Sequence, residues 1–161
     1  MRSIAFISLG LGLLAVGCAP ADVAGNYTVN VTNGENECGF SGWDPDAETV
    51  AVPVVITQDG DVVQVTVEGA PGVFFDIVAG SRRFNGTVGG SHVQGDLIGS
   101  VTGRQGDCAY TITVELDADV SGDVIMGQLA YRPITNHHAD CGVLETCSNV
   151  QLFNGTRPPT E

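Results

Sequence analysis

The chain alternates between apolar and polar residues over several short segments. Residues 111–120 alternate without a break, and residues 26–32 repeat the pattern. Because successive side chains of a β-strand point to opposite faces, this alternation is typical of a strand with one buried face. The rest of the chain beyond the N-terminal region has no sustained 3.6-residue spacing of apolar positions. The pattern therefore predicts an all-β protein.

Apolar and alternating segments recur about every ten residues, separated by turn-forming residues such as Asp59-Gly60. Most connections are short enough for hairpins, which favours a meander over Greek-key crossings. We therefore expect an antiparallel meander of about 8–9 strands that forms a closed or nearly closed small barrel, with a two-sheet sandwich as the alternative. The expected strands are residues 26–32, 50–56, 63–67, 73–78, 84–88, 93–100, 111–120, 124–132 and 150–154.

The N-terminus has the features of an export signal. A positive end at Met1-Arg2 precedes an uncharged apolar run over residues 4–16, and small residues precede Cys18. Ala15-Val16-Gly17-Cys18 resembles the lipobox of bacterial lipoproteins. That resemblance implies cleavage before Cys18, attachment of acyl chains such as palmitate to it, and a place in the cell envelope. Ala19 in place of Asp favours the outer membrane. The alternative is an ordinary signal peptide cleaved near Ala19 or Ala21.

This interpretation divides the chain into a signal peptide (1–17), a lipidated tether (18–24), a β-barrel domain (25–157) and a tail (158–161). Without the signal peptide, five Arg face 19 Asp and Glu, a net charge of −14, and the chain has no Lys. Such a surface repels the phosphate backbone of nucleic acids and anionic lipid head groups. We therefore expect no nucleic-acid partner, and membrane contact through the lipid alone.

Four cysteines remain beyond Cys18, and an even number in an exported domain predicts two disulfides. If the last strand pairs with the first in a barrel, Cys38 lies near Cys147 and Cys108 near Cys141. We therefore predict the disulfides Cys38–Cys147 and Cys108–Cys141. The alternative pairing joins Cys141 to the nearby Cys147 and leaves Cys38 for Cys108. Metal binding by these cysteines is a weaker alternative, because their spacing is wider than in structural zinc sites.

The first expected strand opens with Gly25-Asn26-Tyr27. A glycine two residues before an aromatic residue resembles the Gly-x-Trp opening of lipocalin-like (calycin) barrels, with Tyr in place of Trp. The resemblance implies a small barrel that can carry an apolar ligand. Inward positions of mainly Val, Ile and Leu do not distinguish a filled barrel from a hollow one.

A few other residues are candidates for a site. A glycine-rich segment contains Phe40 and Trp43, which either form a contact surface or fold back to cap one end of the barrel. Two groups are weak candidates for metal binding. Asp117, Asp119 and Asp123 have the opening spacing of a calcium loop without its final glutamate, and His137 and His138 lie near Asp140, with His92 as a conceivable third histidine.

The chain has no nucleophile motif, phosphate loop or cofactor motif, so we expect neither an enzyme nor a cofactor. These observations favour a non-catalytic structural or interaction module on the cell envelope, with an envelope protein or a small apolar ligand as the candidate partner. The alternative function is a lipocalin-like carrier of a small apolar ligand.

Overall fold

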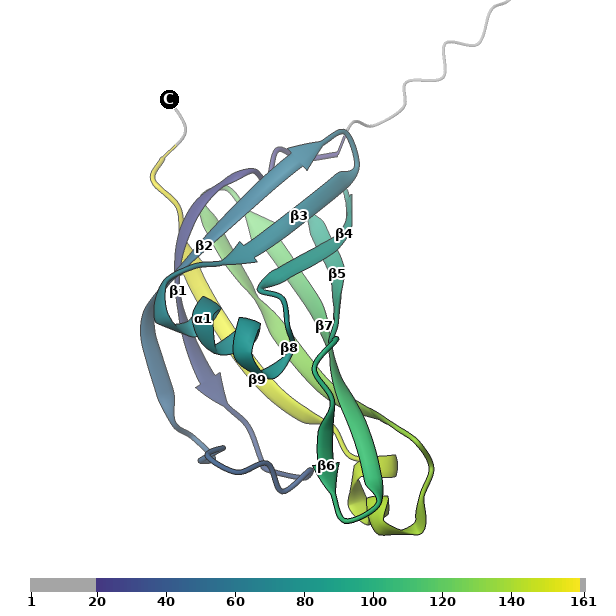
Figure 1. The fold of residues 1–161 in the computed structure, drawn as a ribbon. Helices are drawn as coiled ribbons and strands as arrows, with labels where there is room; N and C mark the ends of the chain where they lie inside the picture. Colours follow the sequence, from purple (N-terminus) through teal and green to yellow (C-terminus); the bar gives the residue numbers. More distant parts are fainter. Residues whose placement is uncertain (1–19, 160–161) are drawn as a thin grey trace, which may run out of the picture.

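A computed structural model describes residues 20–159 of the chain, so Cys18 and the signal segment lie outside the described residues. Eight antiparallel strands form a closed barrel (Figure 1). Each strand pairs with its neighbour in order, β5 pairs with β7, and β1 pairs with β9 to complete the circle. The strands are β1 (Gly25–Asn33), β2 (Glu48–Asp59), β3 (Val62–Val67), β4 (Arg83–Gly89), β5 (His92–Ile98), β7 (Cys108–Ser121), β8 (Val124–Thr135) and β9 (Asn149–Thr156). The predicted meandering barrel is confirmed and is compatible with a calycin-like fold.

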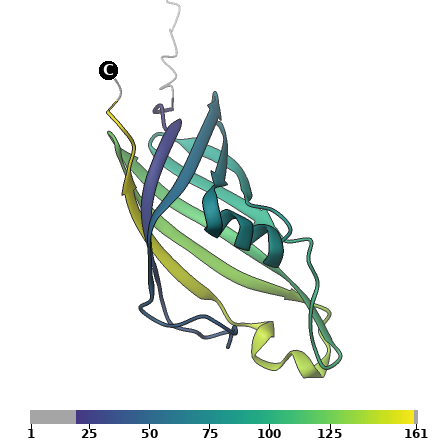
Figure 2. The same cartoon turned by 60° about the vertical axis from the view of Figure 1, so that its left-hand side comes forward.

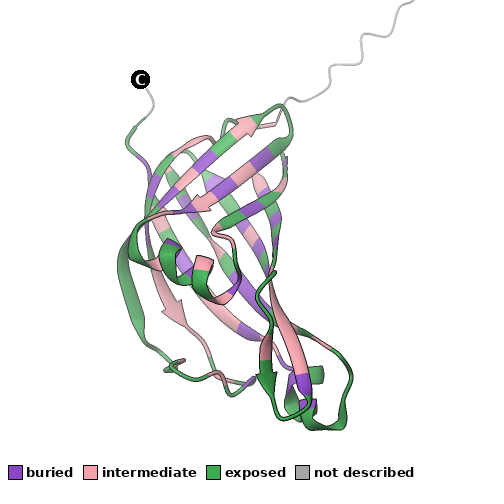
Figure 3. Ribbon diagram, in the orientation of Figure 1, coloured by how far each residue is buried: buried purple, intermediate pink, exposed green. Residues whose placement is uncertain are grey.

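Alternation along each strand places one set of side chains inside the barrel. On β7, Val114, Leu116 and Val120 are buried, whereas Glu115 and Asp119 face solvent. Figure 3 shows the same alternation of buried and exposed residues along the other strands. Burial of the apolar set is therefore what fixes the register, because a slip of one residue would turn it outward.

Glycines at two inward-facing strand positions let neighbouring strands approach each other closely. A Cβ at Gly86 would lie 1.9 Å from the carbonyl oxygen of Gln94, and one at Gly155 would lie 2.3 Å from that of Thr28. Both glycines belong to a Phe-Asn-Gly-Thr segment that occurs twice in the chain, and Phe84 and Phe153 of these segments are buried in the core. The repeat therefore recurs where an inward aromatic side chain is followed by a close approach of neighbouring strands.

The expected strand at 73–78 is wrong, because this segment belongs to helix α1 (Gly69–Val78). A short apolar run cannot be assigned to strand or helix by periodicity alone. Pro71 lies in the first turn, where a missing N–H breaks no helical hydrogen bond. Phe75 packs into the barrel core, and Figure 2 shows α1 in front of the strands. A ninth strand, β6 (Gly103–Gln105), pairs only with the start of β7 and was not expected.

One end of the barrel is closed by packed side chains. Val23 is fully buried, and Tyr27 donates a hydrogen bond from its hydroxyl to the Val23 carbonyl over 3.0 Å. The guanidinium of Arg157 lies 5.7 Å from the centre of the Tyr27 ring and donates to the carbonyls of Ala24 and Asp22. The packed domain thus includes residues before Gly25, where we had placed the tether.

The opposite end is held together by both disulfides. Cys38–Cys147 joins the β1–β2 loop to the segment just before β9, and Cys108–Cys141 joins β7 to η1 (Ala139–Glu145), a 3₁₀-helical segment. Both predicted pairings are confirmed, and the local Cys141–Cys147 alternative is excluded. Within residues 20–159, no helix combines the length and the apolar character needed to span a membrane.

Candidate ligand-binding cavity

The barrel contains a cavity of about 950 Å³ that reaches from its core to the end that carries α1 and the disulfides. This volume lies at the upper end of the roughly 300–1,000 Å³ that is usual for small-molecule sites. The deep wall is formed by inward apolar side chains, among them Val54, Ile56, Val65, Leu116, Ile125 and Leu129. The barrel is therefore hollow, a property that the inward residue types alone did not reveal.

The mouth of the cavity is framed by α1 and the β1–β2 loop. Phe74 and Val78 of α1 line it on one side, and Phe40 and Trp43 line it on the other. Phe74 remains 61% exposed and Ile77, one turn further, 67% exposed. Exposed apolar side chains grouped beside a cavity are typical of a surface that contacts apolar molecules.

Phe40 and Trp43 fold back onto the barrel and line the cavity as well. Trp43 meets the ring of Tyr131 edge-on, with centroids 5.3 Å apart, and its Nε1–H donates to the Gly34 carbonyl over 2.9 Å. Both aromatic side chains pack against the core cluster while staying partly exposed. Phe40 and Trp43 therefore take the place at the barrel end that the capping alternative of the sequence analysis predicted.

A chain of neutral polar groups lies on the wall near the mouth. The Tyr131 hydroxyl donates to Gln151 Oε1, Gln151 Nε2 donates to Asn33 Oδ1 over 2.7 Å, and Asn33 Nδ2 donates to the Asp44 carbonyl over 3.0 Å. Burial raises the pKa of Tyr131, so its hydroxyl stays protonated. These groups can fix the polar end of a ligand that is otherwise apolar.

Sequence reasoning missed this polar chain, although a signal existed. Phe153 faces inward, and the period of two along β9 then turns Gln151 inward as well. A polar residue at an inward position needs a partner, which Tyr131 and Asn33 supply across the two neighbouring strands.

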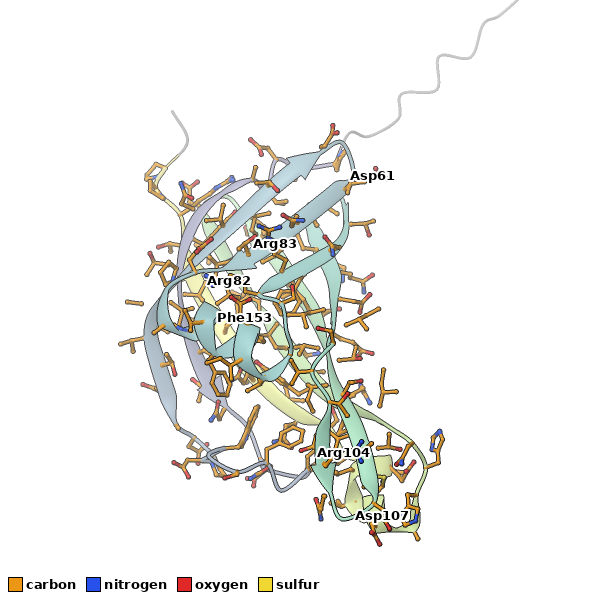
Figure 4. All side chains as sticks on the ribbon, viewed as in Figure 1. Asp61, Arg82, Arg83, Arg104, Asp107 and Phe153 are labelled. Atoms are coloured by element: carbon orange, nitrogen blue, oxygen red, sulfur yellow. A yellow bond between two sulfur atoms is a disulfide. The ribbon has the colours of Figure 1, made fainter. Side chains whose placement is uncertain are left out.

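The charges near the cavity are unevenly distributed. Among residues 20–159, no Arg, His, Asp or Glu side chain lines it. Exposed acidic residues instead lie in or next to the β1–β2 loop beside the mouth, at Glu35, Glu37, Asp44, Asp46 and Glu48. Figure 4 shows Arg104 and Asp107 in the region of β6 and β7, away from Phe153, which lies behind α1 in this view.

The residues of the calcium-like spacing are not brought together. Asp117 and Asp119 face outward on β7 and flank His92, whose ring nitrogens lie 3.3 Å and 3.0 Å from their carboxylates. The hydrogen bond with Asp119 raises the pKa of His92. Asp123 instead accepts from Arg157 Nε over 3.3 Å at the closed end.

The two adjacent histidines diverge. His137 Nδ1 lies 2.8 Å from Glu145, and the hydrogen bonds of Glu145 with Thr135 and His137 lower its pKa. His138 groups with Asp140 and Asp107, with one ligand atom of each within 4.8 Å of the others. All three side chains are exposed, and the Asp140 carboxylate already accepts from the Asp107 N–H over 2.8 Å.

Comparisons of the chain with protein families, with curated proteins and with solved structures give no match.

Proposed function

We propose that the protein is a non-catalytic carrier that holds a small apolar ligand inside its barrel. The observation that supports this proposal is the cavity of about 950 Å³ with an apolar deep wall. Empty volume inside a barrel forfeits packing contacts and so lowers the stability of the fold, a loss that a bound ligand offsets. Exposed apolar side chains at the mouth are consistent with passage of an apolar molecule.

The polar chain near the mouth supports a binding role rather than a catalytic one. Tyr131, Gln151 and Asn33 donate in one direction along the wall, and each is neutral. The arrangement can orient a polar group, but it includes no acid, base or nucleophile whose pKa is brought near neutrality. Cavities with a few polar groups on apolar walls are typical of small-molecule binding sites.

A fluorescence titration tests the proposal. N-phenyl-1-naphthylamine, an uncharged dye that brightens in apolar surroundings, should bind the purified barrel at one site. Because Trp43, the only Trp of the chain, lines the mouth, energy transfer from it to the dye should report the same binding.

Matched variants locate the site. Val65 and Leu129 face the cavity, whereas their neighbours Thr66 and Gln128 face away. The double variant Val65→Trp/Leu129→Trp should weaken dye binding at least tenfold, because its two indole rings occupy the cavity. The double variant Thr66→Trp/Gln128→Trp should bind the dye as tightly as the wild type does. Dye binding that is absent from the wild type, or equally strong in both double variants, would refute the carrier proposal.

We further propose that the carrier is a lipoprotein of the cell envelope, attached through Cys18 and sorted to the outer membrane. The lipobox resemblance supports this proposal. Ala21, three residues later, already donates its N–H to Gly90 at the closed end over 2.8 Å. Attachment there would turn the closed end toward the bilayer and the mouth away from it. The test is to express the full chain in a double-membrane bacterium: the wild type should fractionate with the outer membrane and Cys18→Ala should not.

A further inference from the structure

We infer that the cavity selects uncharged ligands and rejects carboxylates and other anions with the same apolar body. This inference rests on the carrier function proposed above and specifies its ligand class. It predicts that a long-chain alcohol, ester or similar neutral lipid binds, whereas the matching fatty acid anion does not.

The first observation is the composition of the wall. Among the described residues, the lining combines apolar side chains with the neutral polar groups of Asn33, Ser41, Thr49, Tyr110, Tyr131 and Gln151. An anion that enters would lose its hydration without meeting a cation, and a buried charge without a partner is strongly unfavourable. A hydroxyl or carbonyl group loses much less, because Tyr131 Oη can accept and the second N–H of Gln151 can donate.

The second observation concerns two arginines next to elements that line the cavity, Arg104 and Arg82. Arg104 follows the lining residue Gly103 on β6, and alternation turns its side chain to the other face of the strand. Arg82, beyond α1, is engaged by Asp76 and lies 3.6 Å from Glu68. Neither guanidinium is directed into the cavity to pair with a ligand carboxylate.

The third observation is the charge beside the mouth. Five exposed acidic residues lie in or next to the β1–β2 loop that carries Phe40 and Trp43. Their field repels an approaching anion, an effect that salt screens over roughly 10 Å at 0.1 M ionic strength. The wall and the loop therefore both disfavour anions. The wall does so because it offers a desolvated anion no cation, and the loop does so by electrostatic repulsion.

Two dyes of nearly the same shape provide the test. N-phenyl-1-naphthylamine is neutral, and 8-anilino-1-naphthalenesulfonate adds one sulfonate to the same ring system. We expect the neutral dye to bind at least tenfold more tightly. Oleyl alcohol should likewise displace it at a concentration at least tenfold lower than oleate, with all lipids kept below their micelle concentrations. Oleylamine should be no better than the alcohol, because the wall has no carboxylate to pair with it.

A comparison at low and high salt distinguishes the contribution of the wall to selectivity from that of the loop. At about 1 M NaCl the repulsion from the loop is largely screened, so a preference for the neutral dye that persists is due to the wall. Gln151→Arg places a cation on that wall and should raise the affinity for the sulfonate dye at least tenfold. Leu152→Arg, one residue further and facing solvent, is the matched control and should not.

Equal or tighter binding of the anionic dye or of oleate by the wild type would overturn the inference, as would tighter binding of oleylamine than of the alcohol or a preference that vanishes at high salt. These results leave the carrier function intact. Failure of both dyes and all three lipids to bind would instead refute the carrier function itself. The wild-type comparison needs no variant, so it decides the question even if Gln151→Arg does not fold.

Discussion

Truncation of Arg157 should be among the most destabilising single substitutions in this barrel. Its side chain is only 6% exposed at the closed end. The guanidinium donates to three backbone carbonyls, those of Ala24, Asp22 and Gly122, and also to the Asp123 carboxylate. Arg157→Ala removes every one of these donors at once and leaves their acceptors at a site from which water is largely excluded.

The size of the effect follows from these contacts. Hydrogen bonds to a charged donor contribute about 1.5–3 kcal/mol each, but water can enter the vacated space and replace part of them. Loss of one partner from a buried charged network costs about 3–5 kcal/mol in general. We therefore expect Arg157→Ala to lower the free energy of unfolding by about 3–4 kcal/mol. Arg157→Lys should recover only part of this loss, because a single ammonium cannot reproduce the planar fork.

Arg132 supplies the matched control. Its side chain is 54% exposed and lies 3.3 Å from Glu115 on the outside of the barrel. An exposed ion pair contributes at most about 1 kcal/mol. Urea denaturation followed by circular dichroism, with both disulfides intact, measures the free energy of unfolding of each variant. If Arg157→Ala costs no more than Arg132→Ala, our account of the closed end is wrong.

Three further predictions concern stability. Replacing Cys38 and Cys147 by Ala should lower the free energy of unfolding, measured by urea denaturation, by about 1 kcal/mol more than replacing Cys108 and Cys141, because loop-closure entropy grows with the sequence separation, which is 109 against 33 residues. Equal losses of stability would contradict this prediction. Gly86→Ala should lower the free energy of unfolding by about 1–3 kcal/mol, because its Cβ would overlap a backbone carbonyl. Gly89→Ala should not destabilise the fold, because a Cβ there meets nothing within 4 Å, and equal melting temperatures of the two variants would contradict the proposed packing. The folded-state pKa of His92 is raised, so its protonated ring stabilises the fold below the unfolded pKa of about 6.5, and this contribution disappears as the pH rises through the folded-state pKa. In urea denaturation, His92→Gln should therefore be less stable than the wild type near about pH 5.5 and equal to it near about pH 8.5. A difference in stability that stays constant across this range would exclude the linkage.

The strands and the disulfides were predictable because both follow from local alternation and from connectivity. A barrel whose last strand pairs with its first places Cys38 beside Cys147 whatever the details of packing. The apolar run at 73–78 was not predictable in the same way. A short apolar run fits a strand or a helix equally well, and here it forms a helix between the neighbouring strands β3 and β4 from which Phe75 packs into the core.

The cavity and the closed end were less accessible to sequence reasoning. Whether inward Val, Ile and Leu side chains fill a barrel depends on its diameter, on how closely neighbouring strands approach at glycines such as Gly86 and on what covers the mouth. Arg157 sits just after the last strand, where a charged residue normally suggests a solvated end. Its role became visible only when its neighbours in space, Tyr27 and the carbonyls around it, were known.

The most direct test of the central proposal is methyl NMR of the barrel with oleyl alcohol. The proposal predicts intermolecular nuclear Overhauser effects from the alkyl protons of the ligand to Leu116 and Leu129, which line the cavity. Leu152, 59% exposed on the outer face of β9, should show none. Contacts confined to Leu152 and other outward methyl groups, or no contacts at saturating ligand, would contradict the proposal that this barrel carries its ligand inside.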